Sequence, residues 1–223
     1  MHAILLSALL ALGASAEKAA PAPPKLEDGT LVFLENVNSV VEFSTRGKIG
    51  HVALAFTDGD TPYIYEATPG EVRRVTAAEY YRELARLNKR RDEDNQIRGI
   101  ALRPKRAYSD AEVAAMRKYL DSQVGRRYSL RNYVRSKPGD GIHCAELAST
   151  TLNQTDRYGF EDCSHIHPQA LYAAMKPISA PPQELAIEPL QVKEPWCARA
   201  QRRTAEWFTW CGWSCQEVWY WCW

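Results

Sequence analysis

The sequence lacks an excess of charge of either sign. Its 223 residues carry 28 Lys and Arg against 27 Asp and Glu, a formal net charge of +1. Proteins that bind nucleic acid through its phosphates carry clustered positive charge, so this composition offers no electrostatic case for a nucleic-acid partner. The length suits one domain with appendages, which is enough chain to bury a hydrophobic core.

Long hydrophobic runs are scarce as well. The apolar run at residues 4–12 is too short to cross a bilayer and is followed by Ala14-Ser15-Ala16. A short apolar run that ends on small residues is typical of a secretory signal peptide. We therefore expect a signal peptide over 1–16, a Pro/Ala linker over 17–25, and a secreted or periplasmic mature protein with no integral membrane segment. A retained N-terminal anchor is the alternative.

Cysteine and tryptophan are nearly absent from the body of the chain. Only Cys144 and Cys163 lie there, while the other four cysteines and all seven tryptophans follow residue 195. Four tail cysteines could form two disulfides among themselves and leave Cys144 free, but the pattern does not fix the pairing. The Trp/Cys-rich tail at 183–223 has three interpretations: a disulfide-stapled aromatic patch for cell-wall sugar or a membrane interface, a buried amphipathic helix, or a stretch outside selection such as a shifted reading frame.

The body of the chain, residues 26–182, changes from strand patterns to helix patterns. The expected strands cover 31–34, 52–56, 62–67, 72–75 and 97–102. The expected helices cover 76–87, 109–124, 144–152 and 168–175. Capping boxes support two of the helix starts, because Thr76 precedes Glu79 and Ser109 precedes Glu112 by three residues. We expect one α+β domain with an antiparallel sheet packed against helices.

Cys144 stands at the junction between a glycine-bearing loop, 137–141, and an apolar helical pattern. A cysteine in the first turn of a helix faces unpaired N–H groups and the positive end of the helix dipole. Both favour the thiolate, which is the nucleophilic form of cysteine. The plainer interpretation is a small buried side chain, the commoner place of a lone free cysteine.

A thiol nucleophile needs an imidazole to take its proton and a polar group to hold that imidazole. Among the five histidines, His2 belongs to the signal peptide, and the side chain of His143 is expected to diverge from its helical neighbour Cys144. His51 lies on an expected strand, and Glu66 lies on the next strand of an expected hairpin. Taken alone, His51 is more simply a satisfied strand histidine and Glu66 an edge carboxylate.

A rival cluster occurs at Cys163, His165 and His167, where three soft-metal ligands fall within five residues. A structural zinc site usually needs four ligands with a recognisable spacing, and no second cluster supplies the rest. We therefore interpret this segment as a loop before the last helix, and we expect neither a metal nor a cofactor.

Four short motifs follow one another along the chain: Gly50-His51-Val52, Tyr65-Glu66-Ala67, Gly125-x-x-Tyr128 and Cys144-Ala145-Glu146-Leu147. Together they resemble the permuted papain-like amidases of the YiiX/YaeF group, within the wider NlpC-type cysteine peptidase superfamily. The resemblance implies a circularly permuted papain-like fold, in which the histidine strand precedes the cysteine helix. It also implies Cys144 as nucleophile, His51 as general base, Glu66 as the group that orients His51, and Tyr128 as a substrate or oxyanion contact.

We therefore expect an enzyme, a thiol hydrolase that cleaves amide bonds through a Cys-His-Glu triad and an acyl-enzyme. The resemblance implies cell-wall peptides of the peptidoglycan type as the substrate class. Related superfamily members act on lipids, so a thiol acyltransferase or lipid esterase is the alternative, favoured by a water-excluding apolar groove at Cys144. An inactive binding module is the non-enzymatic alternative, favoured by a disulfide at Cys144 or by His51 lying out of its reach.

Overall fold

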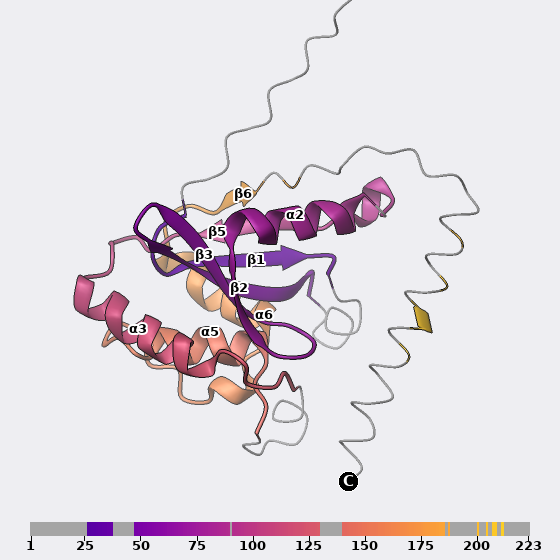
Figure 1. The fold of residues 1–223 in the computed structure, drawn as a ribbon. Coiled ribbons are helices and arrows are strands. Elements are labelled where there is room, and N and C mark those ends of the chain that lie inside the picture. The colour runs from indigo at the N-terminus through magenta and orange to yellow at the C-terminus, as the bar shows by residue number, and fades with distance from the viewer. Residues whose placement is uncertain are drawn as a thin grey trace, which may run out of the picture.

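The computed structural model describes residues 26–37, 47–89, 91–129, 140–185 and 187, with five further residues in the tail, 200, 204, 207, 208 and 211. Six strands form one antiparallel sheet in the order β4-β3-β2-β1-β5-β6 (Figure 1). The strands are β1 Thr30–Glu35, β2 Ile49–Asp58, β3 Thr61–Ala67, β4 Val72–Thr76, β5 Arg98–Leu102 and β6 Gln183–Leu185. The expected α+β class and antiparallel sheet are therefore confirmed, whereas circular permutation remains a prediction.

Within the described part of the chain, four α-helices accompany the sheet. They are α2 Ala77–Asn88, α3 Asp110–Gln123, α5 Cys144–Leu152 and α6 Pro168–Met175. The two predicted capping boxes are present, with Thr76 and Glu79 at the start of α2 and Ser109 and Glu112 at the start of α3. Each box satisfies backbone N–H groups that have no acceptor within the helix.

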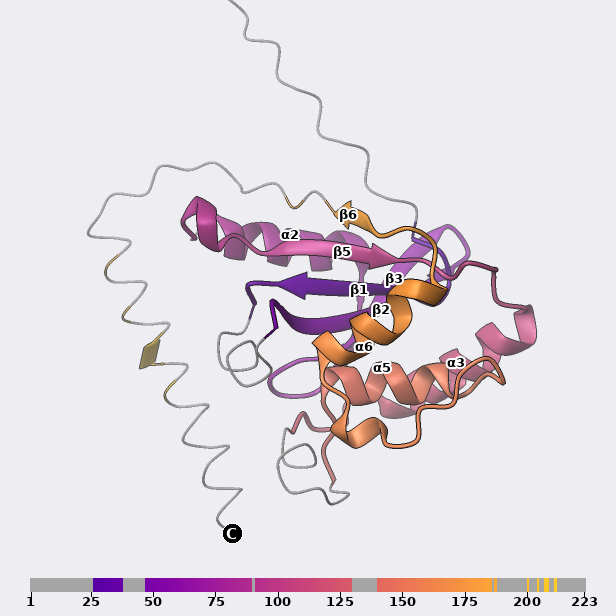
Figure 2. The ribbon, with the colours of Figure 1, turned by 180° about the vertical axis from the view of Figure 1, so that it is seen from behind.

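The sheet is covered on both faces. One hydrophobic cluster joins one face to α3, α5 and α6 through Met116, Leu147 and Leu171. A second cluster joins the other face to α2 through Tyr80 and Leu84. Figures 1 and 2, which are opposite views, place α2 and α6 on opposite sides of the sheet.

The two layers explain a difference from the sequence expectation at β2. Its alternation predicted one well-buried face, but Val52 to Phe56 are all buried. Val52 and Leu54 pack in the cluster of α5, whereas Ala53 and Ala55 pack in the cluster of α2. The small alanine side chains are therefore as fully buried as the large ones on the opposite face.

The residues that follow the predicted domain boundary at 182 pack on the sheet. Residues 183–185 form β6, which pairs Gly99 with Leu185, and Leu185 and Ile187 are buried in the cluster of α2. The predicted signal peptide and Pro/Ala linker lie outside the described residues. Among the residues that are described, no helix is both long and apolar enough to cross a membrane.

Beyond residue 187, the Trp/Cys-rich tail is described at only five positions. Trp207 and Phe208 are helical and exposed at 58% and 64%, with ring centroids 5.2 Å apart. Trp207 is therefore not a buried residue of an amphipathic helix. The other tryptophans of the tail lie outside the described residues, and its three interpretations stay open there.

Candidate active site

Cys144 is the first residue of α5, and its thiol is free and only 5% exposed. His143 precedes it as the N-cap residue, and its ring Nδ1 accepts a hydrogen bond from the Glu146 backbone N–H at 3.3 Å. N–H groups of a first helical turn have no acceptor within the helix and form the positive end of its dipole. The Cys144 thiol therefore lies where an anion is stabilised.

A close backbone contact holds the start of α5 in place. Residues 127–129 pair with Ile142, whose N–H donates to Arg127 O at 2.9 Å and whose carbonyl accepts from Ser129 N at 3.1 Å. A Cβ on Gly141 would lie 2.2 Å from Ser129 Cβ. Gly141, three residues before Cys144, thus permits the close approach of residues 127–129. The preceding residue, Arg126, accepts a hydrogen bond from Val72 N at the start of β4 at 2.8 Å.

His51 and Glu66 come from the neighbouring strands β2 and β3. The register pairs Leu54 with Tyr65, so Glu66 and His51 are diagonal neighbours on one face of the hairpin. A bulge lies beside His51, because the pairing with β1 passes from His51 directly to Ile49 and leaves Gly50 as an extra residue. Bulges raise the local twist and re-aim side chains, and this one lies at the candidate site.

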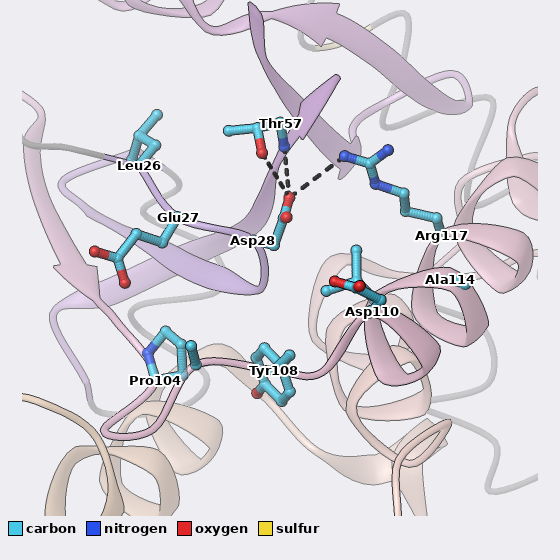
Figure 3. A pocket seen from close by; sticks show the side chains of 11 residues that line it. Leu26, Glu27, Asp28, Thr57, Pro104, Tyr108, Asp110, Ala114 and Arg117 are labelled. Atoms are coloured by element: carbon cyan, nitrogen blue, oxygen red, sulfur yellow. Dashed lines mark hydrogen bonds and ion pairs between the residues drawn. The ribbon is translucent and has the colours of Figure 1, made fainter. Parts of the chain in front are cut away.

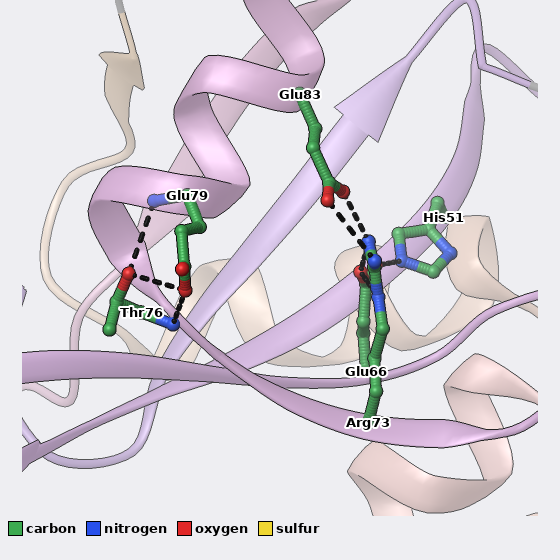
Figure 4. A network of polar contacts seen from close by, with 6 residues as sticks. All are labelled: His51, Glu66, Arg73, Thr76, Glu79 and Glu83. Carbon is green, nitrogen blue, oxygen red and sulfur yellow. Dashed lines mark hydrogen bonds and ion pairs between the residues drawn. The ribbon is translucent and has the colours of Figure 1, made fainter.

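The ring of His51 is oriented by its contact with Glu66. His51 Nε2 lies 2.7 Å from Glu66 Oε2 (Figure 4). Because a carboxylate only accepts hydrogen bonds, Nε2 carries a proton, which leaves Nδ1 as the ring nitrogen available to Cys144. This orders the three residues as thiol, imidazole and carboxylate.

The electrostatics favour a thiolate–imidazolium pair. Burial alone would raise the pKa of the Cys144 thiol, but hydrogen bonds with His143 and His51 and the charge of His51 lower it to about 6. Burial alone would lower the pKa of His51, but its contacts with Cys144 and then Glu66 raise it to about 10. Between these two values the thiol is ionised while the imidazole is protonated.

Glu66 stays ionised despite being only 4% exposed. Burial alone would raise its pKa, yet the hydrogen bond to His51 and the charges of His51 and Arg73 lower it. Arg73 donates to Glu66 Oε1 from Nε at 2.8 Å and from Nη2 at 2.6 Å, and it also contacts Glu83 on α2. A buried carboxylate is therefore shared between an imidazolium and a guanidinium.

His143 lies closer to Cys144 than the sequence predicted. Its backbone is extended rather than helical, with φ −108° and ψ 168°, so the rule that adjacent helical side chains diverge does not apply. The ring is 2% exposed, and Nε2 lies 2.9 Å from the Ser164 carbonyl while Nδ1 accepts from Glu146. Burial alone would lower the pKa of His143, but its contacts with Cys144, the Ser164 carbonyl and Glu146 raise it. His51 is the better acceptor of the thiol proton because it alone of the two has a carboxylate within hydrogen-bonding distance of its ring.

Two tyrosines lie close to the candidate site. Tyr128, the predicted substrate or oxyanion contact, is 5% exposed, and its backbone forms a bridge with Ile142 two residues before Cys144. Tyr80 of α2 was not predicted. Its hydroxyl is buried without a hydrogen-bond partner among the described residues, and burial followed by the charge of Glu66 raises its pKa well above the usual value. Only its position in an amphipathic helix was visible in the sequence.

The rival cluster at residues 163–167 does not converge. His165 Nδ1 contacts Asp162 Oδ2 at 2.5 Å, and His167 Nδ1 accepts from Ala170 N as the N-cap of α6. Cys163 Sγ accepts from Asn153 at 3.4 Å. Within the described part of the chain, no three His, Cys, Asp or Glu side chains form a group that could hold a metal ion.

A cavity of about 590 Å³ lies away from Cys144, between β2 and the start of α3 (Figure 3). Asp28 lines it and accepts from the backbone and hydroxyl of Thr57 at 2.6 and 3.0 Å, with Arg117 at 3.4 Å. Thr57 is six residues beyond His51 along β2, which corresponds to about 20 Å. This cavity therefore does not supply the apolar groove at Cys144 that a lipid substrate would favour.

Comparisons with known proteins support the fold. No protein-family model matches the sequence, and no curated protein matches it. Among solved structures, the chain is similar to the metalloprotein YiiX of Escherichia coli O157:H7, a DUF1105 protein, with a TM-score of 0.52 and 12% sequence identity. The match covers 73% of this chain and 98% of that one. At this identity the likeness shows a shared fold, and the predicted resemblance to the YiiX group is supported to that extent.

Proposed function

We propose that the protein is an exported cysteine amidase that cleaves peptide-type amide bonds through an acyl-enzyme. The observation that carries this proposal is the convergence of a free thiol at a helix start, Cys144, with the carboxylate-oriented ring of His51. A nucleophile, a base and a group that orients the base are the parts that thiol hydrolysis requires.

In the acylation step the Cys144 thiolate attacks the carbonyl carbon of the amide and forms a C–S bond, while the carbonyl electrons move to oxygen. The resulting oxyanion meets N–H groups at the start of α5, with the Cys144 N–H as the nearest candidate donor; a donor of this kind is typically worth about 3 kcal/mol. Protonated His51 gives its Nδ1 proton to the leaving nitrogen as the C–N bond breaks.

In the deacylation step water attacks the thioester, and neutral His51 takes a proton from that water. The C–S bond then breaks, the carboxylic acid leaves, and the thiolate–imidazolium pair of Cys144 and His51 is restored. Glu66 neither gains nor loses a proton in either step, and its negative charge stabilises the imidazolium of His51.

The proposal extends to topology and substrate class. The strand of His51 precedes the helix of Cys144 in the chain, the order expected of a circularly permuted papain-like fold of the NlpC type. Cell-wall peptides are the proposed substrates, because the predicted signal peptide would deliver the enzyme to the periplasm or the exterior. A free thiol at Cys144 that interacts with His51 strongly enough to shift the pKa of both groups supports this proposal over an inactive binding module.

The test compares hydrolysis of peptidoglycan-derived peptides by the wild-type protein and by Cys144→Ala, with release of the new amine as the readout. We expect Cys144→Ala to abolish release because the nucleophile is gone, whereas Cys163→Ala should retain it because Cys163 bonds to Asn153 away from the site. Circular dichroism checks that both variants fold. Wild-type turnover in Cys144→Ala would refute the proposal.

A further inference from the structure

Glu66 is held from the side opposite His51 by an arginine that sequence reasoning passed over. We propose that Arg73 is a positioning residue of the site, which fixes the Glu66 carboxylate so that one oxygen remains for His51, and that Glu83 of α2 holds Arg73 in turn. This inference rests on the proposed function, because it matters only if His51 serves Cys144.

The strand register brings Arg73 to Glu66. The two residues are directly opposed in the pairing of β4 with β3. Arg73 directs both Nε and Nη2 at Oε1 of Glu66, at 2.8 and 2.6 Å, while Oε2 contacts His51 at 2.7 Å (Figure 4). Each carboxylate oxygen thus has its own partner, and rotation of the carboxylate would break contacts on both sides at once.

Glu83 completes the arrangement from α2. Arg73 Nη2 contacts Glu83 Oε2 at the same 2.6 Å that separates it from Glu66 Oε1, and Nη1 contacts Glu83 Oε1 at 3.4 Å. The two carboxylates therefore approach one nitrogen, and without the guanidinium they would face each other as like charges. Repulsion or uptake of a proton would then withdraw Glu66 from His51.

The burial of Glu66 separates this contact from an ordinary surface ion pair. Its side chain is 5% exposed, while those of Arg73 and Glu83 are 34% and 43% exposed. Exposed pairs contribute little because water screens them, whereas a buried carboxylate depends on its partners to remain charged. Arg73 thus acts on the buried member of the network, Glu66, which is the residue that contacts His51.

The neighbouring Arg74 provides a matched control. It leaves β4 on the other side, where it pairs with Asp58 at 3.0 Å and lies over the ring of Tyr63 at 4.0 Å. Arg74→Gln removes the same charge from the same strand as Arg73→Gln, but it does not touch Glu66. A loss of strand stability alone would affect both variants.

The experiment measures the rate at which iodoacetamide alkylates Cys144 between pH 5 and 9, with Cys163 of the same molecule as the ordinary thiol. We expect Arg73→Gln to slow alkylation at pH 6 by about threefold to fivefold, with convergence toward wild type at higher pH. The alkylation rate of Arg73→Lys, which keeps the charge but not the two-point contact, should lie between those of wild type and Arg73→Gln. The rate of Arg74→Gln should match that of wild type. In a Glu66→Gln background, Arg73→Gln should add nothing, because Arg73 acts through Glu66.

The outcomes separate the inference from the proposed function. If wild-type Cys144 reacts no faster than Cys163, Cys144 is not an activated nucleophile and the proposed function fails. If wild-type Cys144 is fast and Arg73→Gln has the same pH profile, or slows alkylation equally in the Glu66→Gln background, Arg73 is not a positioning residue. Should Arg73→Gln fail to fold, Arg73→Lys and Glu83→Gln carry the same test, since each weakens the hold on Glu66 while the backbone pairing of β4 remains.

Discussion

Replacement of Glu66 by glutamine tests whether a buried carboxylate keeps His51 protonated beside the thiolate. Glutamine has nearly the same shape but a single oxygen, which can still accept from His51 Nε2, 2.7 Å from the Glu66 carboxylate, while its NH2 group then faces the Arg73 guanidinium. The change therefore removes a charge and leaves the packing of β3 intact. Because the imidazolium loses its counter-charge and burial favours the neutral ring, Cys144 should keep its proton to a higher pH.

The size of this pKa change follows from the replacement of a hydrogen bond between His51 and a charged carboxylate by one between His51 and a neutral amide. A hydrogen bond to a charged group contributes about 1.5–3 kcal/mol and a neutral one about 0.5–1.5 kcal/mol. The loss is thus about 1–2 kcal/mol, and 1.36 kcal/mol corresponds to one pKa unit. The pKa of the Cys144 thiol is about 6 in the wild type, so we expect it to rise by about one unit in Glu66→Gln.

Alkylation by iodoacetamide reports this shift, because only the thiolate reacts. The wild-type alkylation rate should rise with pH around pH 6 and then level off. The rate of Glu66→Gln should rise at a pH about one unit higher, so at pH 6 it should be about fivefold slower than wild type. Above pH 8 the two rates should converge, since both thiols are then ionised. Superimposed profiles would refute the coupling of Glu66 through His51 to Cys144.

Two further predictions concern the framework of the site. Gly141→Ala places a Cβ 2.2 Å from Ser129 Cβ, so we expect a loss of about 1–3 kcal/mol in the free energy of unfolding, measured with urea; wild-type stability would show that residues 127–129 shift freely. Thr76→Ala removes the cap that accepts from Glu79 N at 3.2 Å, so we expect a loss of about 1 kcal/mol, and Thr76→Ser should keep most of the wild-type stability. Equal losses in the two Thr76 variants would contradict the capping argument.

Features encoded in a few neighbouring residues were predictable from the sequence. The capping boxes at Thr76 and Ser109 placed the starts of α2 and α3, and the glycine loop before Cys144 placed the start of α5. Each depends on contacts within one helical turn, where residue type and spacing determine the hydrogen bonds. The hairpin that carries His51 and Glu66 followed from alternation in the same way.

Features that depend on distant partners were not predictable. β6 has three residues, of which Gln183 and Glu184 are exposed. The sequence therefore contains no apolar pattern that predicts the pairing of β6 with β5. Arg73 lies beside Arg74 in a short strand, and from the sequence alone it is indistinguishable from a solvent-exposed arginine of an edge strand. Its contact with Glu66 needs the β3–β4 register, and its contact with Glu83 needs the packing of α2.

The arrangement of these contacts links the candidate site to both layers of the fold. Cys144 belongs to the cluster that packs α5 on one face of the sheet, whereas Glu83 belongs to α2 on the other face. His51, Glu66 and Arg73 connect them through the sheet itself. Because the buried carboxylate has partners on both sides, the proposed function makes docking of α2 a factor in the orientation of the imidazole beside the thiol on the opposite layer. On the proposed function, β2, β3, β4 and α2 must therefore all be in place for the Cys144 thiol to be activated.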